Sequence, residues 1–110
     1  MSVMVKKNNI TMTRGDTLKI KINITDSVGE PYIPVEGDTI RFAAKENYND
    51  KLPCILKNIP YDTCILHLEP SDTKDLKQPC SYLYDIEITL NDGTVDTFIA
   101  GTLDIKEEVH

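Results

Sequence analysis

The stretch that decides the fold runs from residue 82 to residue 90 and reads Tyr82-Leu83-Tyr84-Asp85-Ile86-Glu87-Ile88-Thr89-Leu90. Every second residue is apolar, which is the pattern of a strand with one buried and one wet face. Asn91-Asp92-Gly93 follows and predicts a tight hairpin loop, because Gly93 is free to adopt a positive φ angle. The chain should then return as an antiparallel strand over 94–99, break or bulge at Ala100-Gly101, and end in a strand over 102–105.

The same period of two recurs on the N-terminal side of this hairpin. Leu18, Ile20, Ile22 and Ile24 alternate with polar residues and predict one strand over 18–24. Further short strands are expected over 10–13, 40–44, 54–56 and 64–68. Polar, Gly-containing and Pro-containing segments separate them, as turns do.

One segment differs from this pattern and predicts a short helix. Ser71 is suited to the N-cap position, and acidic residues follow in the first turn, where the helix dipole favours them. Pro79 should end it. We expect one helical turn near residues 71–76, crossing between two sheets.

Together these segments predict an all-β protein. The expected fold is an immunoglobulin-like antiparallel β-sandwich of seven to eight short strands, with a partly open barrel as the alternative. Residues 1–8 are expected to form a flexible lead-in, and residues 9–110 a single sandwich domain. The expected core comprises Leu18, Ile20, Ile22, Ile40, Phe42, Leu66, Leu68, Tyr84, Ile86, Ile88 and Leu103.

Composition agrees with this fold and excludes several functions. Ile, Val and Thr contribute 30 of the 110 residues and Ala only three, which favours strands over a helical bundle. Lys and Arg number 12 against 18 Asp and Glu, so the net charge of −6 gives no electrostatic footprint for nucleic acid. No apolar run is long enough to span a membrane, and the N-terminus does not resemble a signal peptide.

The sequence contains no pattern typical of an enzyme, and we expect no metal and no cofactor. His67 should point outward, opposite the apolar positions of its strand. Arg14-Gly15-Asp16 spells an adhesion tripeptide, but its place before an alternating strand indicates a turn. Cys54, Cys64 and Cys80 are expected to be free thiols, with a Cys54–Cys64 bridge as the alternative.

Two tyrosines open the longest strand. In immunoglobulin-like sandwiches a tyrosine at this corner often ties its hydroxyl back to the preceding turn, so Tyr82 or Tyr84 is expected to have this structural role. Sugar stacking by the same rings is the less favoured alternative, since the alternation places both on the apolar face. In the loops, the candidate tyrosines for stacking on a sugar are Tyr32, Tyr48 and Tyr61.

Several short motifs occur in an informative order. Arg14-Gly15-Asp16-Thr17 precedes the Ile-rich strand, and Gly37-Asp38-Thr39-Ile40-Arg41-Phe42 follows it. Then come Leu68-x-Pro70-x-Asp72-Thr73-x-x-Leu76, Tyr82-x-Tyr84-Asp85-Ile86-Glu87, Asp92-Gly93-Thr94 and Gly101-Thr102-Leu103-x-Ile105. In this order, from about Ile10 to Val109, the chain resembles small structural proteins of tailed phages and prophages of Gram-positive bacteria. It looks most like the N-terminal domain of the upper baseplate protein family.

The chain departs from that family at two places. Pro79-Cys80-Ser81 stands where the family usually has a glycine before the tyrosine strand. The chain stops at His110, where family members often continue into helical and receptor-binding regions. A complete small virion protein, a decoration protein and a fragment are all open at this point.

The resemblance implies an immunoglobulin-like sandwich without catalytic residues. It also implies a structural part of a phage tail tip or baseplate that acts through protein–protein contacts, in the virion after assembly in the bacterial cytoplasm. A carbohydrate-binding or adhesion module is the alternative. We expect the lead-in residues Val3, Met4 and Val5, together with Thr102 and Asp104 on an exposed last strand, to bind other tail proteins or a second copy.

Overall fold

The structure is a computed structural model that describes residues 6–7, 9–25, 28–76 and 80–107. Most of the described residues lie in strands and only one short turn is helical, so the all-β prediction is confirmed at the level of fold class. The described strands are β1 (Lys6–Lys7), β2 (Ile10–Thr13), β3 (Leu18–Lys21), β4 (Ile24–Thr25), β5 (Pro31–Tyr32), β6 (Thr39–Lys45), β7 (Ile55–Ile59), β8 (Ile65–Leu68), β9 (Cys80–Thr89) and β10 (Val95–Lys106). The helix is α1 (Pro70–Thr73).

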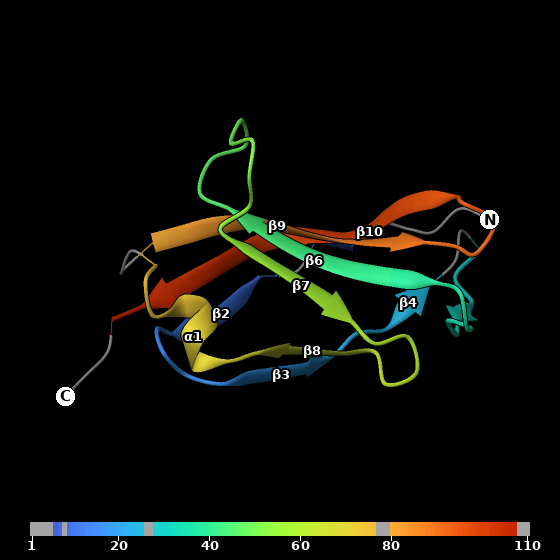
Figure 1. The fold of residues 1–110 in the computed structure, drawn as a ribbon, viewed down its shortest axis with the longest axis horizontal. Coiled ribbons are helices and arrows are strands. Elements are labelled where there is room, and N and C mark those ends of the chain that lie inside the picture. Colours follow the sequence, from blue (N-terminus) through green and yellow to red (C-terminus); the bar gives the residue numbers. More distant parts are fainter. Residues whose placement is uncertain (1–5, 8, 26–27, 77–79, 108–110) are drawn as a thin grey trace.

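One large, strongly curled sheet forms most of the molecule (Figure 1). Its strands lie in the order β7-β6-β9-β10, all antiparallel to their neighbours. β1 and β2 pair with the other side of β10, and both run parallel to it. The prediction of a purely antiparallel fold is therefore wrong at this edge. Alternation within a strand does not reveal the direction of its partner, so the pattern could not distinguish the two.

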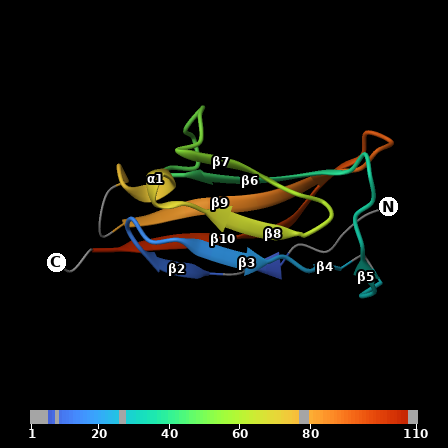
Figure 2. The same cartoon turned by 60° about the horizontal axis from the view of Figure 1, so that its bottom comes forward.

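A pair of short strands, β3 and β8, lies beside the large sheet (Figure 2). A second small pair, β4 with β5, stands at the end of the molecule where β6 begins. The short helix α1 connects β8 to β9, so the chain crosses from the small sheet to the large one through it. This crossing turn is the one predicted near residues 71–76.

The core lies between β3–β8 and the inner face of the large sheet. All but two of the predicted core residues are buried there, including Phe42, Leu66, Leu68 and Leu103, which are fully inaccessible. Leu18 and Ile20 are only half-buried and pack against the edge of this cluster. The ring of Tyr84 stacks on Phe42 with ring centroids 5.3 Å apart.

The single strand predicted over 18–24 is interrupted. β3 ends at Lys21, and β4 begins at Ile24 with a new partner, β5. At the break the Ile22 N–H donates to the Cys64 carbonyl at 2.7 Å, beyond the end of the β3–β8 ladder. The apolar side chains keep their period of two through the break, which is why the sequence shows one strand where the structure has two.

Other strand boundaries also differ from the prediction, most clearly those of β7 and β10. The strand expected over 54–56 is β7, which begins one residue later and extends to Ile59. The last two expected strands are one strand, β10, and its bulge lies between Thr97 and Ile99 instead of at Ala100-Gly101. The described strands therefore outnumber the predicted seven to eight.

The helix begins earlier than Ser71. Glu69 is the N-cap and Pro70 occupies the first turn, where its missing N–H costs no hydrogen bond. The Asp72 carboxylate accepts a hydrogen bond from the Glu69 N–H at 2.7 Å, which closes the start of the turn. Pro79, expected to end the helix, lies outside the described residues.

Candidate functional site

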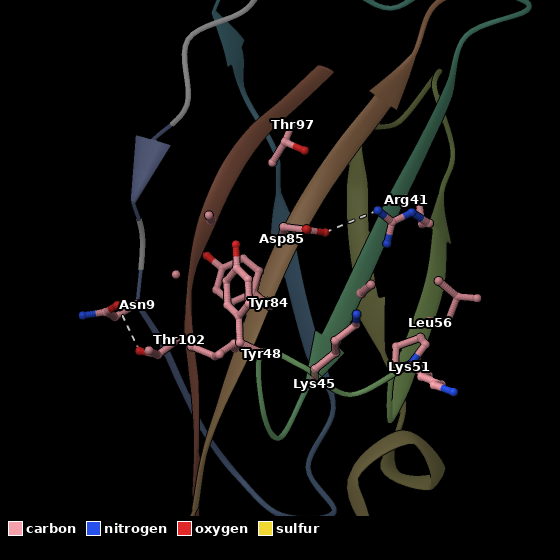
Figure 3. Close-up of a pocket in the computed structure, with 15 residues that line it drawn as sticks. Asn9, Arg41, Lys45, Tyr48, Lys51, Leu56, Tyr84, Asp85, Thr97 and Thr102 are labelled. Carbon is pink, nitrogen blue, oxygen red and sulfur yellow. Dashed lines mark hydrogen bonds and ion pairs between the residues drawn. The ribbon is translucent and has the colours of Figure 1, made fainter. Parts of the chain in front are cut away.

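The outer face of the large sheet carries a groove (Figure 3). Across the sheet, Leu56 of β7 lies beside Ala43 of β6, Ala43 beside Asp85 of β9, and Asp85 beside Ala100 of β10. The small side chains of Ala43 and Ala100, and Gly101 next to them, leave the floor low. A groove results because larger residues surround this row.

One wall of the groove comes from the loop between β6 and β7. This loop rises from the outer face (Figure 1) and contributes Tyr48, Lys51 and Pro53. The Asn47 N–H donates to the Asp50 carboxylate at 3.0 Å, and the Cys54 N–H donates to the Ala44 carbonyl at 2.8 Å. The first bond closes a turn inside the loop and the second joins its two ends, while the Tyr48 side chain remains 86% exposed.

The groove has a volume of about 990 Å³, and apolar atoms contribute more of its surface than polar atoms. Its polar lining residues are Asn9, Arg41, Lys45, Lys51, Asp85, Thr97 and Thr102. Leu56 is 60% exposed and Leu83 39% exposed at its margin. This combination of a mostly apolar concave surface with a few convergent polar groups is typical of a binding site.

Charged groups are unevenly distributed in the groove. The Arg41 guanidinium lies 3.4 Å from the Asp85 carboxylate and 3.2 Å from that of Glu87. Both acids therefore already have a cationic partner. Within the described part of the chain, neither Lys45 nor Lys51 forms an ion pair.

The predicted partner-binding residues are placed differently from expectation. Thr102 lines the groove, and its hydroxyl donates to the Asn9 side-chain oxygen at 3.0 Å. Asp104 accepts a hydrogen bond from the Ser81 hydroxyl. Neither lies on an exposed last strand, because β10 is paired with β9 on one side and with β1 and β2 on the other. Val3, Met4 and Val5 lie outside the described residues.

β7 is an edge strand of the large sheet, and three features protect that edge. Pro53 and Pro60 flank the strand. Lys57, between the buried Ile55 and Ile59, directs its ammonium to the Asp72 carboxylate of α1 at 2.9 Å. Flanking prolines and an inward-facing charge are common means by which proteins prevent an edge from adding another strand.

The residues predicted to be structural, Tyr82, Tyr84 and Gly93, lie in the core or in the hairpin loop. Tyr82 and Tyr84 face the core at 2% and 4% exposure, and burial raises the pKa of the Tyr84 phenol. The hydrogen bond of Tyr82 or Tyr84 to the preceding turn stays a prediction. Gly93 has a φ angle of 94° in the hairpin, where the Leu90 N–H donates to the Thr94 carbonyl.

The three tyrosines considered for sugar stacking have different surroundings. Tyr48 lines the groove with its side chain open to solvent. The Tyr61 side chain, in the turn before β8, is partly exposed. The Tyr32 hydroxyl donates a hydrogen bond to the Asp38 carboxylate. Of the three, only Tyr48 lies in the groove.

The remaining residues considered in the sequence analysis are the Arg14-Gly15-Asp16 tripeptide, His67 and the three cysteines. The Gly15 N–H donates to the Thr73 hydroxyl and the Arg14 guanidinium to the Lys74 carbonyl, so this tripeptide packs against α1 as a turn. His67 is exposed, as predicted. Cys54, Cys64 and Cys80 are free thiols, and burial raises the pKa of Cys54 and of Cys64.

Sequence reasoning did not identify the groove. The signal was present on the outward positions of β6, where Ala43 stands between Arg41 and Lys45 and is small enough to be buried at the groove floor. A small residue between two cations is unusual for a solvated face. In the described part of the chain, no three His, Cys, Asp or Glu side chains gather as a metal site requires, and no helix is long and apolar enough to cross a membrane.

Comparison with known proteins gives no assignment: no family model and no curated sequence matches this chain.

Proposed function

We propose that this chain is an immunoglobulin-like, non-enzymatic structural module of a phage or prophage tail tip or baseplate, which acts through protein–protein contacts. Two lines of support exist: the order of motifs in the sequence, and the arrangement of strands and exposed apolar surface. The groove on the outer face is the observation that carries the proposal.

Strand order supports the immunoglobulin-like part of the proposal. The series β7-β6-β9-β10 has the order of strands C′, C, F and G in a variable-type immunoglobulin domain, and β3 with β8 has the place of the B–E pair. In such domains the chain changes sheets between E and F, where α1 lies here.

The surface supports binding through a sheet face. Tyr48, Leu52, Leu56 and Leu83 are all exposed on or beside the loop and the sheet that form the groove. Exposed apolar side chains that gather around a concave surface mark protein-interaction or ligand sites more often than isolated ones do. The last strand, β10, is internal to the sheet, and the edge strand β7 is protected by its flanking prolines and Lys57.

The proposal is tested by co-expression with the proteins encoded beside this gene. If it is correct, the chain elutes in size-exclusion chromatography with light scattering as a complex with at least one tail protein. Ala43→Arg, which fills the groove floor, should abolish that complex. Lys19→Glu on the outward side of β3 is the control and should leave it intact.

A carbohydrate-binding module is the second candidate, and Tyr48 favours it. An exposed aromatic ring beside Asn9, Thr97 and Thr102 could stack on a sugar while those side chains bind its hydroxyls. If the chain stays alone with every tail protein yet binds a glycan array, and Tyr48→Ala removes that binding, this second function replaces the first.

A further inference from the structure

The groove has a local charge opposite to that of the whole molecule. The chain has a net charge of −6. In the groove, however, Lys45 and Lys51 extend from β6 and from the loop, without a carboxylate partner among the described residues. Asp85 is the acidic lining residue, and Arg41 already pairs with it.

Two acidic residues lie next to these lysines in the sequence, Glu46 beside Lys45 and Asp50 beside Lys51. Asp50 accepts a hydrogen bond from the Asn47 N–H within the loop. Neither lines the groove. Two lysines in one recess of an acidic protein favour an occupant that is itself negatively charged there, because complementary charge across an interface guides docking and disfavours partners of the wrong charge.

The shape favours an extended chain. The groove crosses four adjacent strands, from Thr102 on β10 to Leu56 on β7. At about 4.8 Å between strands this is a length of about 14 Å, enough for about four residues of extended peptide at about 3.3 Å each. In such a peptide, alternate side chains face the floor, so apolar and acidic residues two positions apart could face Ala43 and the lysines.

A peptide fits this lining better than a sugar does. Carbohydrate sites usually offer more than one accessible aromatic ring, and in this groove Tyr84 is 4% exposed with its ring stacked on Phe42. Tyr48 is therefore the single exposed aromatic among the lining residues described. The exposed Leu56 and Leu83 add apolar surface that a peptide side chain covers and a hydroxyl-rich sugar does not.

We infer that the outer-face groove binds an extended, acidic peptide segment of a partner protein, with a carboxylate between Lys45 and Lys51 and an apolar side chain over Ala43. This inference rests on the proposed function and specifies its binding site and the chemistry of its partner.

The test uses a positional-scanning library of capped pentapeptides on the immobilised full chain. We expect selection of Asp or Glu at one position and of an aliphatic or aromatic residue two positions away. In Lys45→Glu/Lys51→Glu, binding of the selected peptide should weaken at least about tenfold, because two attractive contacts become repulsive. Chemical shifts of Ala43 and Ala100 should move on titration of the wild type.

Lys19→Glu/Lys21→Glu is the matched control. It changes the net charge equally on the exposed face of β3, and it should bind the peptide as the wild type does. Circular dichroism and the thermal midpoint establish that both variants fold. Selection of neutral or basic residues, no selection, or equal weakening in the control would each overturn the inference. So would binding of a sulfated oligosaccharide that is lost with Lys45 and Lys51 while no peptide is selected.

The two proposals fail separately. If the wild type and Lys45→Glu/Lys51→Glu both join a tail complex, the proposed function stands and the groove inference is wrong. If the wild type joins no tail protein but selects acidic peptides, the site stands and the tail assignment is wrong.

Discussion

Asp38 connects three separate parts of the chain through one buried carboxylate. It accepts hydrogen bonds from the Tyr32 hydroxyl at 2.5 Å, the Val35 N–H at 3.0 Å and the Asn91 N–H at 3.0 Å. The preceding Gly37 has a φ angle of 100°, and a Cβ there would lie 2.9 Å from the Asn91 Cβ. This corner therefore requires glycine at position 37 and a hydrogen-bond acceptor at position 38, which accounts for the Gly37-Asp38 pair in the sequence.

Replacing Asp38 should destabilise the fold more than any exposed acid does. Asp38→Ala leaves the Val35 and Asn91 N–H groups without their acceptor, and the expected cost is about 3 kcal/mol. Asp38→Asn keeps one acceptor oxygen and should cost less. Urea unfolding measures both. The exposed neighbour Glu36 supplies the control, and a Glu36→Ala loss as large as that of Asp38→Ala would contradict the assignment.

Tyr32 gives this corner a dependence on alkaline pH. Burial, followed by the hydrogen bond to Asp38, raises the pKa of the Tyr32 phenol from 10.0 to about 12. The unfolded chain therefore loses this proton first as the pH rises. The stabilising contribution is complete below about pH 10 and disappears as the pH rises through about 12.

The measurement is the free energy of unfolding at pH 8, 10.5 and 11.5. The wild type should lose stability over this range more steeply than Tyr32→Phe, which has no phenol to ionise at that site. Parallel curves for the two proteins would show that the Tyr32 proton is not linked to folding.

Cys64 is the non-glycine residue with a positive φ angle, 54°, among the described residues. Its N–H donates to the Pro60 carbonyl at 2.8 Å, so the turn before β8 closes like the end of a helix, where glycine is preferred. Alanine normally exceeds glycine in stability by about 0.5–1 kcal/mol within regular structure. Here the order should reverse, with Cys64→Gly at least as stable as Cys64→Ala in thermal unfolding. A clearly more stable alanine variant would indicate that this φ angle carries no strain.

At the level of elements, α1 joins both sheets although it is one turn long. Its buried Thr73 hydroxyl accepts the Gly15 N–H at 2.8 Å from the β2–β3 turn. Its Asp72 carboxylate binds Lys57 of β7. The turn after β2 and the edge strand β7 are thus held to the same helix.

Thr73→Val tests this connection. Valine has the shape of threonine but removes the acceptor, and an unpaired Gly15 N–H should cost about 1–3 kcal/mol. Thr73→Ser retains the hydroxyl and should remain closer to the wild type. Equal midpoints of thermal unfolding for the valine variant and the wild type would show that the hydroxyl contributes nothing.

Some strands could be predicted from the sequence, whereas their pairing partners could not. The strongest alternation, over 82–90, predicted the central strand Cys80–Thr89 and its buried face, because burial on one face imposes the period of two. The partner of Ile10–Thr13 could not be read, since parallel pairing with Leu103–Lys106 depends on residues at the other end of the chain. The groove could not be predicted for the same reason. Its lining comes from four strands and a loop that are far apart in the sequence, so no local pattern contains them all.

For the whole molecule, stability should depend on the core between the two sheets. Ile86 is 1% exposed at its centre, and Ile86→Ala should cost about 2–5 kcal/mol through lost transfer energy and a cavity. The exposed Val95→Ala, on the neighbouring strand, is the control and should cost far less. Chemical denaturation gives both values; an unchanged midpoint for the Ile86 variant would place the core elsewhere.

The parallel pairing of β2 with β10 also has a mechanical consequence. Ile10 lies beside Leu103 and Thr13 beside Lys106, with both strands running the same way. Tension applied before Ile10 and after Lys106 pulls the two strands in opposite directions along their length. The bonds between them are then loaded in shear and must rupture together, whereas tension across the β9–β10 hairpin would open its bonds one at a time. The fold is therefore built to resist being stretched from these two points, whatever it is fastened to.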